Sequence, residues 1–254
     1  TNIINWYKDG LSITVLNMPF EADNASNASD YSGFGNNGTP VNSPVWNATG
    51  GYDGKGAFVF DGTNNITIAD SASLDLTDQI SIELWVNSSN WTLDNDSCFS
   101  LVEKLTGGSN GYLLFACRDD SESNNHLRFT ADDDWDAVGY NMTNLNENQW
   151  YHIVAIYNGT NQTLYVDGEF VAGIDQTGTM TPNNENLTIA GGMDGPFDGI
   201  IDELRIYNIS LTAQQITALY NNRTDLIVSQ ETSAGDVWNA TITTNDGTID
   251  GWSN

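Results

Sequence analysis

The chain has 254 residues, of which 39% are hydrophobic and 11% aromatic, so it can bury the core of one large domain or of two smaller ones. Seven Lys and Arg residues stand against thirty-four Asp and Glu residues, for a formal net charge of −27. This charge repels nucleic acid and anionic lipid and excludes both as expected partners. It suits a medium rich in salt or divalent cations, although a cytosolic enzyme of a halophile would be as acidic.

Apolar and polar residues alternate through most of the chain, as in half-buried strands. In chain order, the alternation predicts strands at 57–60, 66–68, 80–86, 99–103, 112–117, 127–130, 150–157, 163–166, 170–174, 187–190 and 200–207. Asp167-Gly168 predicts a two-residue hairpin turn. A helical pattern occurs once, at 211–220, with Thr212 and Gln215 spaced as in a capping box. Many short strands joined by Gly- and Asn-rich turns indicate an all-β sandwich or barrel.

The sequence predicts no membrane span, because it contains no apolar run of about 18 residues. Its first residues lack the charged and apolar regions of a signal peptide. We therefore expect any signal peptide or anchor to have been removed or to lie outside this sequence.

Fifteen Asn-X-Ser/Thr sequons indicate a heavily N-glycosylated extracellular or cell-surface protein, although an Asn- and Thr-rich surface would also generate sequons passively. They begin at Asn24, Asn27, Asn37, Asn47, Asn65, Asn87, Asn90, Asn95, Asn141, Asn158, Asn161, Asn186, Asn208, Asn222 and Asn239.

The two cysteines, Cys98 and Cys117, lie in strand-like runs on either side of a Gly-rich turn. This arrangement predicts a hairpin with a cross-strand disulfide in an oxidising compartment. Two buried thiols are the alternative, and no neighbouring Cys or His suggests a metal site.

The ordered set of motifs resembles the laminin-G-like, or concanavalin A-like, jelly roll. The motifs are MPFE at 18–21, DYSG at 30–33, GNNG at 35–38, GKGAFVFDG at 54–62, ISIELWV at 80–86, WYHIV at 150–154, LYVDG at 164–168 and FDGIIDELRIY at 197–207. Each motif is weak alone, but the order is specific. The resemblance implies a jelly-roll β-sandwich with one short C-terminal helix over residues 16–224.

The two flanks resemble parts of an immunoglobulin-like domain. NWYKDG at 5–10 is similar to its tryptophan-bearing strand, and residues 232–242 are similar to its late strands, followed by a turn at 245–247. We therefore expect a jelly roll inserted into a partial immunoglobulin-like sandwich formed by 1–15 and 225–254. The alternative is that both flanks add edge strands to the jelly roll. A sandwich lacking strands would expose edges that another chain could cover.

The resemblance also implies a structural calcium ion that joins an N-terminal segment to the last strand. The carried-over ligands are Glu21, Asp23, Asp30 and Asp202, which supply the hard oxygens that calcium prefers. The alternative is that these acids are solvated surface or turn residues.

Glycoside hydrolases share this fold and need two carboxylates about 5–10 Å apart. Glu83 has no acidic neighbour two residues away, and alternation places Asp202 and Glu203 on opposite faces of a strand. No nucleophile elbow or phosphate loop is present. His152 matches a structural histidine of the family, and His126 follows a polar turn. We therefore predict no catalytic residues.

Three functions follow from this reading. The main prediction is a glycosylated, archaeal-type structural subunit of an extracellular surface layer or filament, assembled with copies of itself by strand complementation. The alternative is a lectin or adhesin module that binds carbohydrate or protein, with Trp135 in the acidic run 132–136, or Trp91, as candidate sugar-stacking residues. A glycan-cleaving enzyme is the third possibility.

Overall fold

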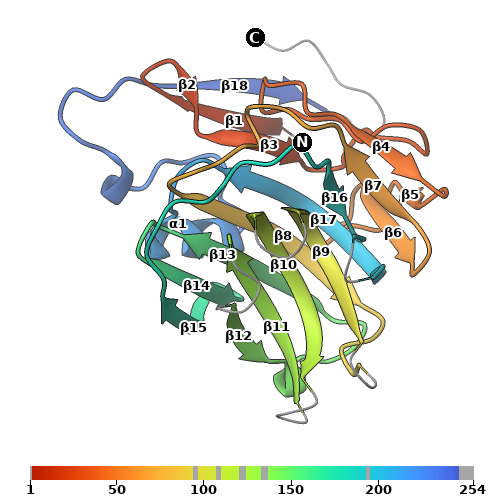
Figure 1. Cartoon of the computed structure of the whole chain (residues 1–254). Coiled ribbons are helices and arrows are strands. Elements are labelled where there is room, and N and C mark those ends of the chain that lie inside the picture. Colours follow the sequence, from red (N-terminus) through yellow and green to blue (C-terminus); the bar gives the residue numbers. More distant parts are fainter. Residues whose placement is uncertain are drawn as a thin grey trace.

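A computed structural model of the chain describes residues 2–93, 97–106, 110–119, 124–132, 137–192 and 195–245. Its strands are all paired in antiparallel fashion, and two large sheets face each other with the main core between them (Figure 1). The all-β sandwich predicted from the sequence is confirmed.

The seven-stranded sheet has the order β12 (Val138–Asn141), β11 (Asn124–Ala131), β10 (Asn110–Asp119), β9 (Cys98–Thr106), β16 (Leu187–Ile189), β7 (Asn65–Ile68) and β4 (Gly38–Val41). The eight-stranded sheet has the order β15 (Glu169–Asp175), β14 (Asn161–Val166), β13 (Trp150–Tyr157), β8 (Ile80–Ser88), β17 (Asp198–Tyr207), β6 (Ala57–Asp61) and β5 (Val45–Asn47), with β3 (Thr14–Met18) also paired to β17.

Period-two alternation directs one face of each strand into this core. In β8, Ile80, Ile82 and Leu84 point inward and are fully buried. The two-residue turn between β14 and β15 forms as predicted, because Asp167 and Gly168 both adopt positive φ, at 51° and 81°.

The outer face of β8, β13 and β17 is also covered. Helix α1 (Ala213–Tyr220) packs Ile216 onto Val154, Ile156 and Tyr207. Thr212 and Gln215 form both hydrogen bonds of the predicted capping box, which fixes the start of the helix. Polar side chains on this outer face are therefore buried rather than solvated.

Strand β17 changes partner along its length. Its first half pairs with β6 as far as Ile201, and its second half pairs with β3 from Leu204. Asp202 and Glu203 lie at the change, where the pairing with β8 also shifts register. Glu203 has a φ of 52°, so the strand bulges here and strict alternation is lost.

The flanks pair with each other. Strand β1 (Asn2–Lys8) lies between β2 (Leu11–Ser12) and β18 (Trp238–Thr244), and Trp6 lies opposite Ala240. This three-stranded sheet lies along one side of the large sheets (Figure 1). The pairing is compatible with the expected insertion, and the immunoglobulin-like assignment and its boundaries stay predictions.

Candidate functional site

Three carboxylates gather where β17 changes partner. Oxygens of Glu21, Asp53 and Glu203 lie within 4.8 Å of one another. Glu21 follows β3, Asp53 precedes β6, and Glu203 occupies the bulge of β17, so the gap between β3 and β6 brings them together. Glu21 is 1% exposed, and its Oε2 has no hydrogen-bond partner within the described part of the chain.

Two basic side chains reach this group. Lys55 Nζ lies 3.3 Å from Glu21 Oε1 and also contacts Asp53, and Arg205 contacts Glu203. The buried carboxyl group of Asp202 is a fourth acidic group beside them. Burial, together with the neighbouring Glu203, raises the pKa of both Glu21 and Asp202. The acids therefore outnumber the bases in a polar pocket that Asn2, Ile4 and Asn222 also line.

Of the four predicted calcium ligands, only Glu21 belongs to this group. Asp202 accepts hydrogen bonds from the backbone of Tyr52 and Glu203, at 2.9 and 2.8 Å. Asp30 instead organises its own loop, accepting from the backbone of Asn17, Ser32 and Asn36. Asp23 accepts from the backbone of Ser29 in the same region. The sequence-based ligand set included Asp23 and Asp30 but neither Asp53 nor Glu203, which the fold brings close to Glu21.

The bulge corrects one further expectation. Alternation predicts that Asp202 and Glu203 point to opposite faces, but both carboxylates approach the 51–55 loop. Asp202 Oδ2 accepts from the Tyr52 amide, and Glu203 lies in the group with Asp53. The positive φ of Glu203 redirects its side chain.

Glu83 belongs to a buried network beneath α1. Its carboxylate accepts from Tyr207 Oη at 2.7 Å, faces His152 Nε2 at 3.2 Å and pairs with Arg205. Burial alone would raise the pKa of Glu83, but these partners hold it below its ordinary value. Glu83 and His152 are at most 1% exposed, so neither carboxylate nor imidazole faces a substrate.

A row of side chains, polar except for the buried Leu113, crosses the outer face of the seven-stranded sheet. Strand register places the members side by side, each opposite the next, in the order Thr39, Thr67, Thr188, Glu103, Leu113 and Thr130. We call this set the threonine row. A surface pocket opens along its middle, lined by Thr67, Thr188 and Glu103 with Glu185 and Asn186. Hydroxyl, carboxylate and amide groups can both donate to and accept from a polyhydroxylated ligand.

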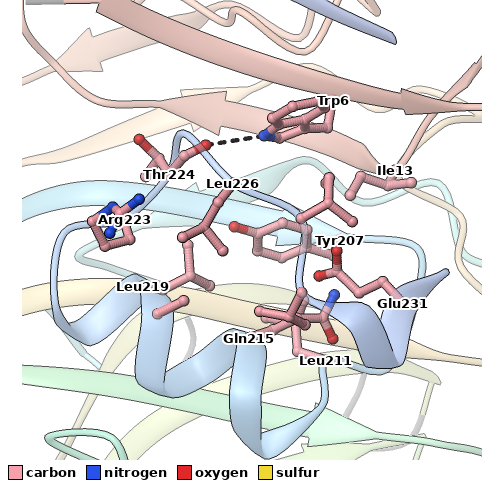
Figure 2. Close-up of a pocket in the computed structure, with 13 residues that line it drawn as sticks. Trp6, Ile13, Tyr207, Leu211, Gln215, Leu219, Arg223, Thr224, Leu226 and Glu231 are labelled. Atoms are coloured by element: carbon pink, nitrogen blue, oxygen red, sulfur yellow. Dashed lines mark hydrogen bonds between the residues drawn. The ribbon is translucent and has the colours of Figure 1, made fainter. Parts of the chain in front are cut away.

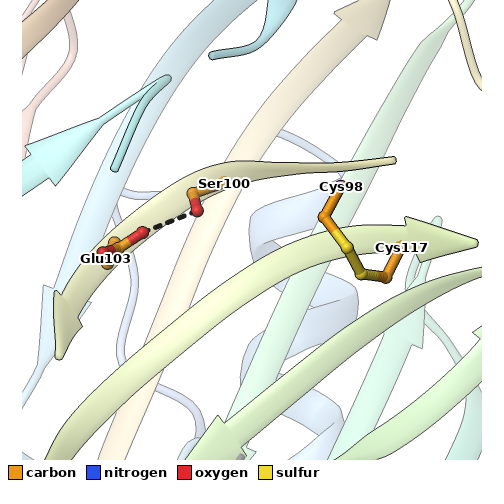
Figure 3. The surroundings of a disulfide bond; sticks show 4 residues. All are labelled: Cys98, Ser100, Glu103 and Cys117. Carbon is orange, nitrogen blue, oxygen red and sulfur yellow. Dashed lines mark hydrogen bonds between the residues drawn. A yellow bond between two sulfur atoms is a disulfide. The ribbon is translucent and has the colours of Figure 1, made fainter. Parts of the chain in front are cut away.

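The same sheet carries the disulfide bond. Cys98 and Cys117 face each other directly across β9 and β10 and are joined, with no free cysteine in the described residues (Figure 3). Two residues from Cys98, Ser100 Oγ donates to Glu103 Oε2 at 2.7 Å and orients this member of the threonine row (Figure 3).

An apolar pocket marks the junction of the flank sheet and the jelly roll. Trp6, Ile13, Leu211 and Leu219 line it, and Trp6 Nε1 donates to the Thr224 carbonyl at 2.9 Å (Figure 2). Glu231 also faces this pocket (Figure 2), and burial raises its pKa to about 7. The residues that line this pocket connect the flank sheet with the segment that follows α1.

One of the two candidate sugar-stacking tryptophans, Trp91, is buried. Trp91 is 2% exposed and packs in the core against Phe99 and Tyr151, so it cannot stack on a ligand. The residues next to Trp91 in the sequence are mostly polar and suggest exposure, but its aromatic neighbours in space bury it. Trp135 and the sequon residue Asn95 lie outside the described residues, as does most of the acidic run. Asp132 is described and accepts from the Thr181 amide.

The described sequon residues lie mostly in loops, turns and strand ends. Asn24, Asn37, Asn47, Asn90, Asn158, Asn186, Asn208, Asn222 and Asn239 are exposed, and Asn27, Asn65, Asn87, Asn141 and Asn161 are partly exposed. None of the described sequon asparagines is buried, so the fold leaves each accessible to some degree. No helix within the described ranges is long and apolar enough to cross a membrane.

The two facing antiparallel sheets define a jelly-roll β-sandwich of the lectin-like class. Residues 60–217 match the model of the Concanavalin A-like lectin/glucanases superfamily, which is more than half of the chain, and the chain belongs to this family. The resemblance seen in the sequence motifs is thereby confirmed for the jelly roll. No curated protein sequence matches the chain.

Solved structures share the fold at low identity. Domain 4 of the extracellular GH43 arabinanase of Geobacillus stearothermophilus, in complex with arabinotriose, is 22% identical, with a TM-score of 0.60 over 82% of this chain and 98% of that one. The binding domain of Paraclostridial Mosquitocidal Protein 1 is 16% identical, with a TM-score of 0.63, and covers 84% of this chain.

The structure of botulinum neurotoxin type C, described as dependent on two ganglioside molecules for cell entry, is 15% identical with a TM-score of 0.61 over 83% of this chain. This chain spans about half of each of the two toxin chains, 52% and 51%. At these identities the likeness shows the shared fold.

Proposed function

We propose that this chain is a non-catalytic carbohydrate-binding module of a secreted or cell-surface protein. The threonine row carries the proposal, because it sets hydroxyls on adjacent strands beside the Glu103 carboxylate in a surface pocket. Its rigid sheet holds these groups in place before a ligand arrives, which lowers the entropy cost of binding. The arabinotriose and ganglioside ligands of the similar structures support the same class of ligand.

Binding without hydrolysis is the reading we favour, although one similar structure is a domain of a glycoside hydrolase. Hydrolysis needs two accessible carboxylates flanking one bond. Glu83 is enclosed by Arg205, His152 and Tyr207, and Asp202 is 1% exposed. In the pocket on the threonine row, Glu185 is exposed, but Glu103 is only 6% exposed and already accepts a hydrogen bond from Ser100. The role of Glu103 is to accept hydrogen bonds from sugar hydroxyls.

A glycan array probed with sugar-free protein from bacterial expression tests this function, with arabinotriose as a defined probe in an affinity gel. We expect binding that Thr188→Val weakens about 5- to 30-fold, since a lost hydrogen bond and an unpaired partner together cost about 1–2 kcal/mol. Valine keeps the β-branched shape of Thr188 and its strand preference. Thr241→Val, on β18, is the matched control and should bind like the parent. If the protein binds no glycan on the array, the proposal is contradicted.

Calcium is proposed as a structural ion at Glu21, Asp53 and Glu203. Glu21 Oε2 is buried and has no hydrogen-bond partner among the described residues, and carboxylates are in excess around it, so a hard divalent cation is supported. When bound, the ion would neutralise acids contributed by three separate segments and so brace the junction of β3, β6 and β17. Lys55 partly neutralises the same carboxylates and would compete with the ion.

N-glycosylation in an extracellular setting is part of the same proposal. The accessible sequon residues and the acidic surface support it. A disulfide-bonded hairpin also suits an oxidising compartment.

The flank sheet favours a second candidate, the structural subunit of a surface layer or filament. Strand β18 is at the edge of its sheet, and its seven residues, WNATITT, carry no charge in a chain of net charge −27. Val237 and Ile242 are 57% and 43% exposed. Edge strands without charge, proline or bulge can accept another strand, so a second copy could pair here.

A further inference from the structure

A surface groove runs across the outer face of β14 and β15, beside two sequons. Its lining combines an aromatic ring with amide and carboxylate groups, contributed by Asn158, Asn161, Thr163, Phe170, Gly173 and Asp175. This chemistry suits a sugar, whose apolar ring face stacks on an aromatic side chain while its hydroxyls make hydrogen bonds.

Strand register sets out the groove in order. Asn161 lies opposite Asp175, Thr163 opposite Gly173, and Tyr165 opposite Phe170. A Cβ atom at Gly173 would lie 3.1 Å from the Phe170 ring, so the missing side chain lets the ring lie along the sheet. Phe170 remains 58% exposed, although its ring also contacts Tyr165 edge-on, at 5.7 Å.

The side chain of Asn161 is held at one end of this groove. Its Oδ1 accepts from Thr160 Oγ1 at 2.9 Å, and its Nδ2 donates to Asp175 Oδ1 at 2.6 Å. Asn161 and Thr163 share a face of β14 and are separated by about 7 Å along the strand, about the length of one sugar residue. A sugar attached to Asn161 can therefore reach Gly173 and the ring of Phe170.

We propose that Asn161 carries an N-linked glycan whose first sugar lies in this groove against Phe170. In the transfer, Asn161 Nδ2 attacks the anomeric carbon of a lipid-diphosphate-linked oligosaccharide. A C–N bond replaces one N–H bond, the C–O bond to the diphosphate breaks, and a proton and the lipid diphosphate leave. The remaining N–H hydrogen stays available to Asp175. The inference rests on the glycosylation proposed above and is independent of the threonine row.

Thr163→Val is the variant that isolates the sugar. It destroys the sequon of Asn161 but keeps the Asn161 side chain and the β-branched shape at position 163. Both the parent and Thr163→Val are made in three backgrounds. One keeps Phe170, and the other two carry Phe170→Ala or Phe170→Leu. Secreted eukaryotic expression followed by trimming to one sugar per site gives the glycosylated set, and bacterial expression gives the sugar-free set.

We expect glycopeptide mass spectrometry to find sugar on Asn161. In the glycosylated set, the parent should unfold about 2–4 °C above Thr163→Val, as one aromatic stacking contact in a domain of this size predicts. The parent and Thr163→Val should have equal unfolding temperatures in the sugar-free set. They should also have equal unfolding temperatures in the glycosylated set when either Phe170 variant is present. Thr241→Val, which removes the Asn239 sequon, should give a shift that does not depend on Phe170.

Two results would overturn the inference. The first is an unmodified Asn161 in the secreted protein, whatever the state of the other sequons. The second is a modified Asn161 whose sugar changes the unfolding temperature equally with and without Phe170. Because the threonine row is tested on sugar-free protein, its failure and the failure of this inference are distinguishable.

Discussion

Arg205 Nη1 lies 3.4 Å from both carboxylate oxygens of Glu83, although 122 residues separate the two in the sequence. Its Nη2 contacts Glu203 in the acidic pocket. One guanidinium therefore connects the buried network beneath α1 with the candidate calcium site. Because both carboxylates depend on the same cation, the stability of the sandwich and the geometry of the pocket are coupled.

Replacing Arg205 should be strongly destabilising. Arg205→Met leaves the carboxylate of Glu83 buried without its charge partner, and breaking a buried pair costs about 3–5 kcal/mol. Urea unfolding measures this loss. Arg223→Met, which breaks the solvent-exposed pair with Asp225, is the control and should leave the unfolding midpoint nearly unchanged. Equal midpoints for the two variants would contradict the role given to Arg205.

Calcium should raise the unfolding temperature. At 100 times its dissociation constant, an ion that binds only the folded chain adds about 2.7 kcal/mol, so chelator should lower the midpoint by several degrees. Glu21→Gln and Asp53→Asn should abolish the difference. Asp225→Asn, which lines the same pocket outside the carboxylate group, should retain it. The same midpoint with calcium and with chelator in the parent protein would refute the site.

Lys55 provides an independent check on the same pocket. Its ammonium group pairs with Glu21 and Asp53, so Lys55→Met removes a competitor of the ion. We expect this variant to unfold below the parent in chelator and to gain more from calcium. An unchanged calcium response would mean that Lys55 and the ion do not share ligands.

Glu231 should make stability depend on pH. Burial raises its folded-state pKa from 4.5 to about 7, so the folded state favours the neutral acid. The stability that it contributes is fully present below pH 4.5 and is lost as the pH rises through about 7. Glu231→Gln should therefore resemble the parent near pH 4 but exceed it at pH 8, by about 1 kcal/mol after allowance for solvent screening. No gain at pH 8 would contradict this account of Glu231.

Strand addition at β18 predicts concentration-dependent self-association. Sedimentation velocity on the parent should detect larger species at high protein concentration, and Ile242→Lys should remove them by placing charge at the edge. Phe34→Lys changes an equally exposed apolar residue in a loop and serves as the control. A parent that stays monomeric at every concentration would leave the structural-subunit candidate without support.

Much of the fold follows from local pattern. Strands at 80–86, 150–157 and 200–207 alternate over many residues, and Thr212 with Gln215 marks the start of α1. The jelly-roll strands β3, β4, β5 and β12 were not predicted, because most are short and β4 contains Pro40. Their strand character depends on neighbours distant in sequence.

The candidate sites show the same limit. The acidic group needs the bulge at Glu203 and the loop that carries Asp53, and neither has a periodic signal. The segments that carry Thr67, Thr188 and Glu103 were all predicted as strands. Their side-by-side order depends on the pairing of β7, β16 and β9, which alternation does not encode.

The most direct measurement is nuclear magnetic resonance of the sugar-free protein, labelled at threonine methyl and backbone amide groups, during titration with the strongest array ligand or with arabinotriose. A ligand in the threonine row should shift the Thr67, Thr188 and Glu103 signals in a saturable manner, and Thr188→Val should weaken the titration. Saturable shifts confined to other surfaces, or no shifts with any array ligand, would contradict the proposed binding face.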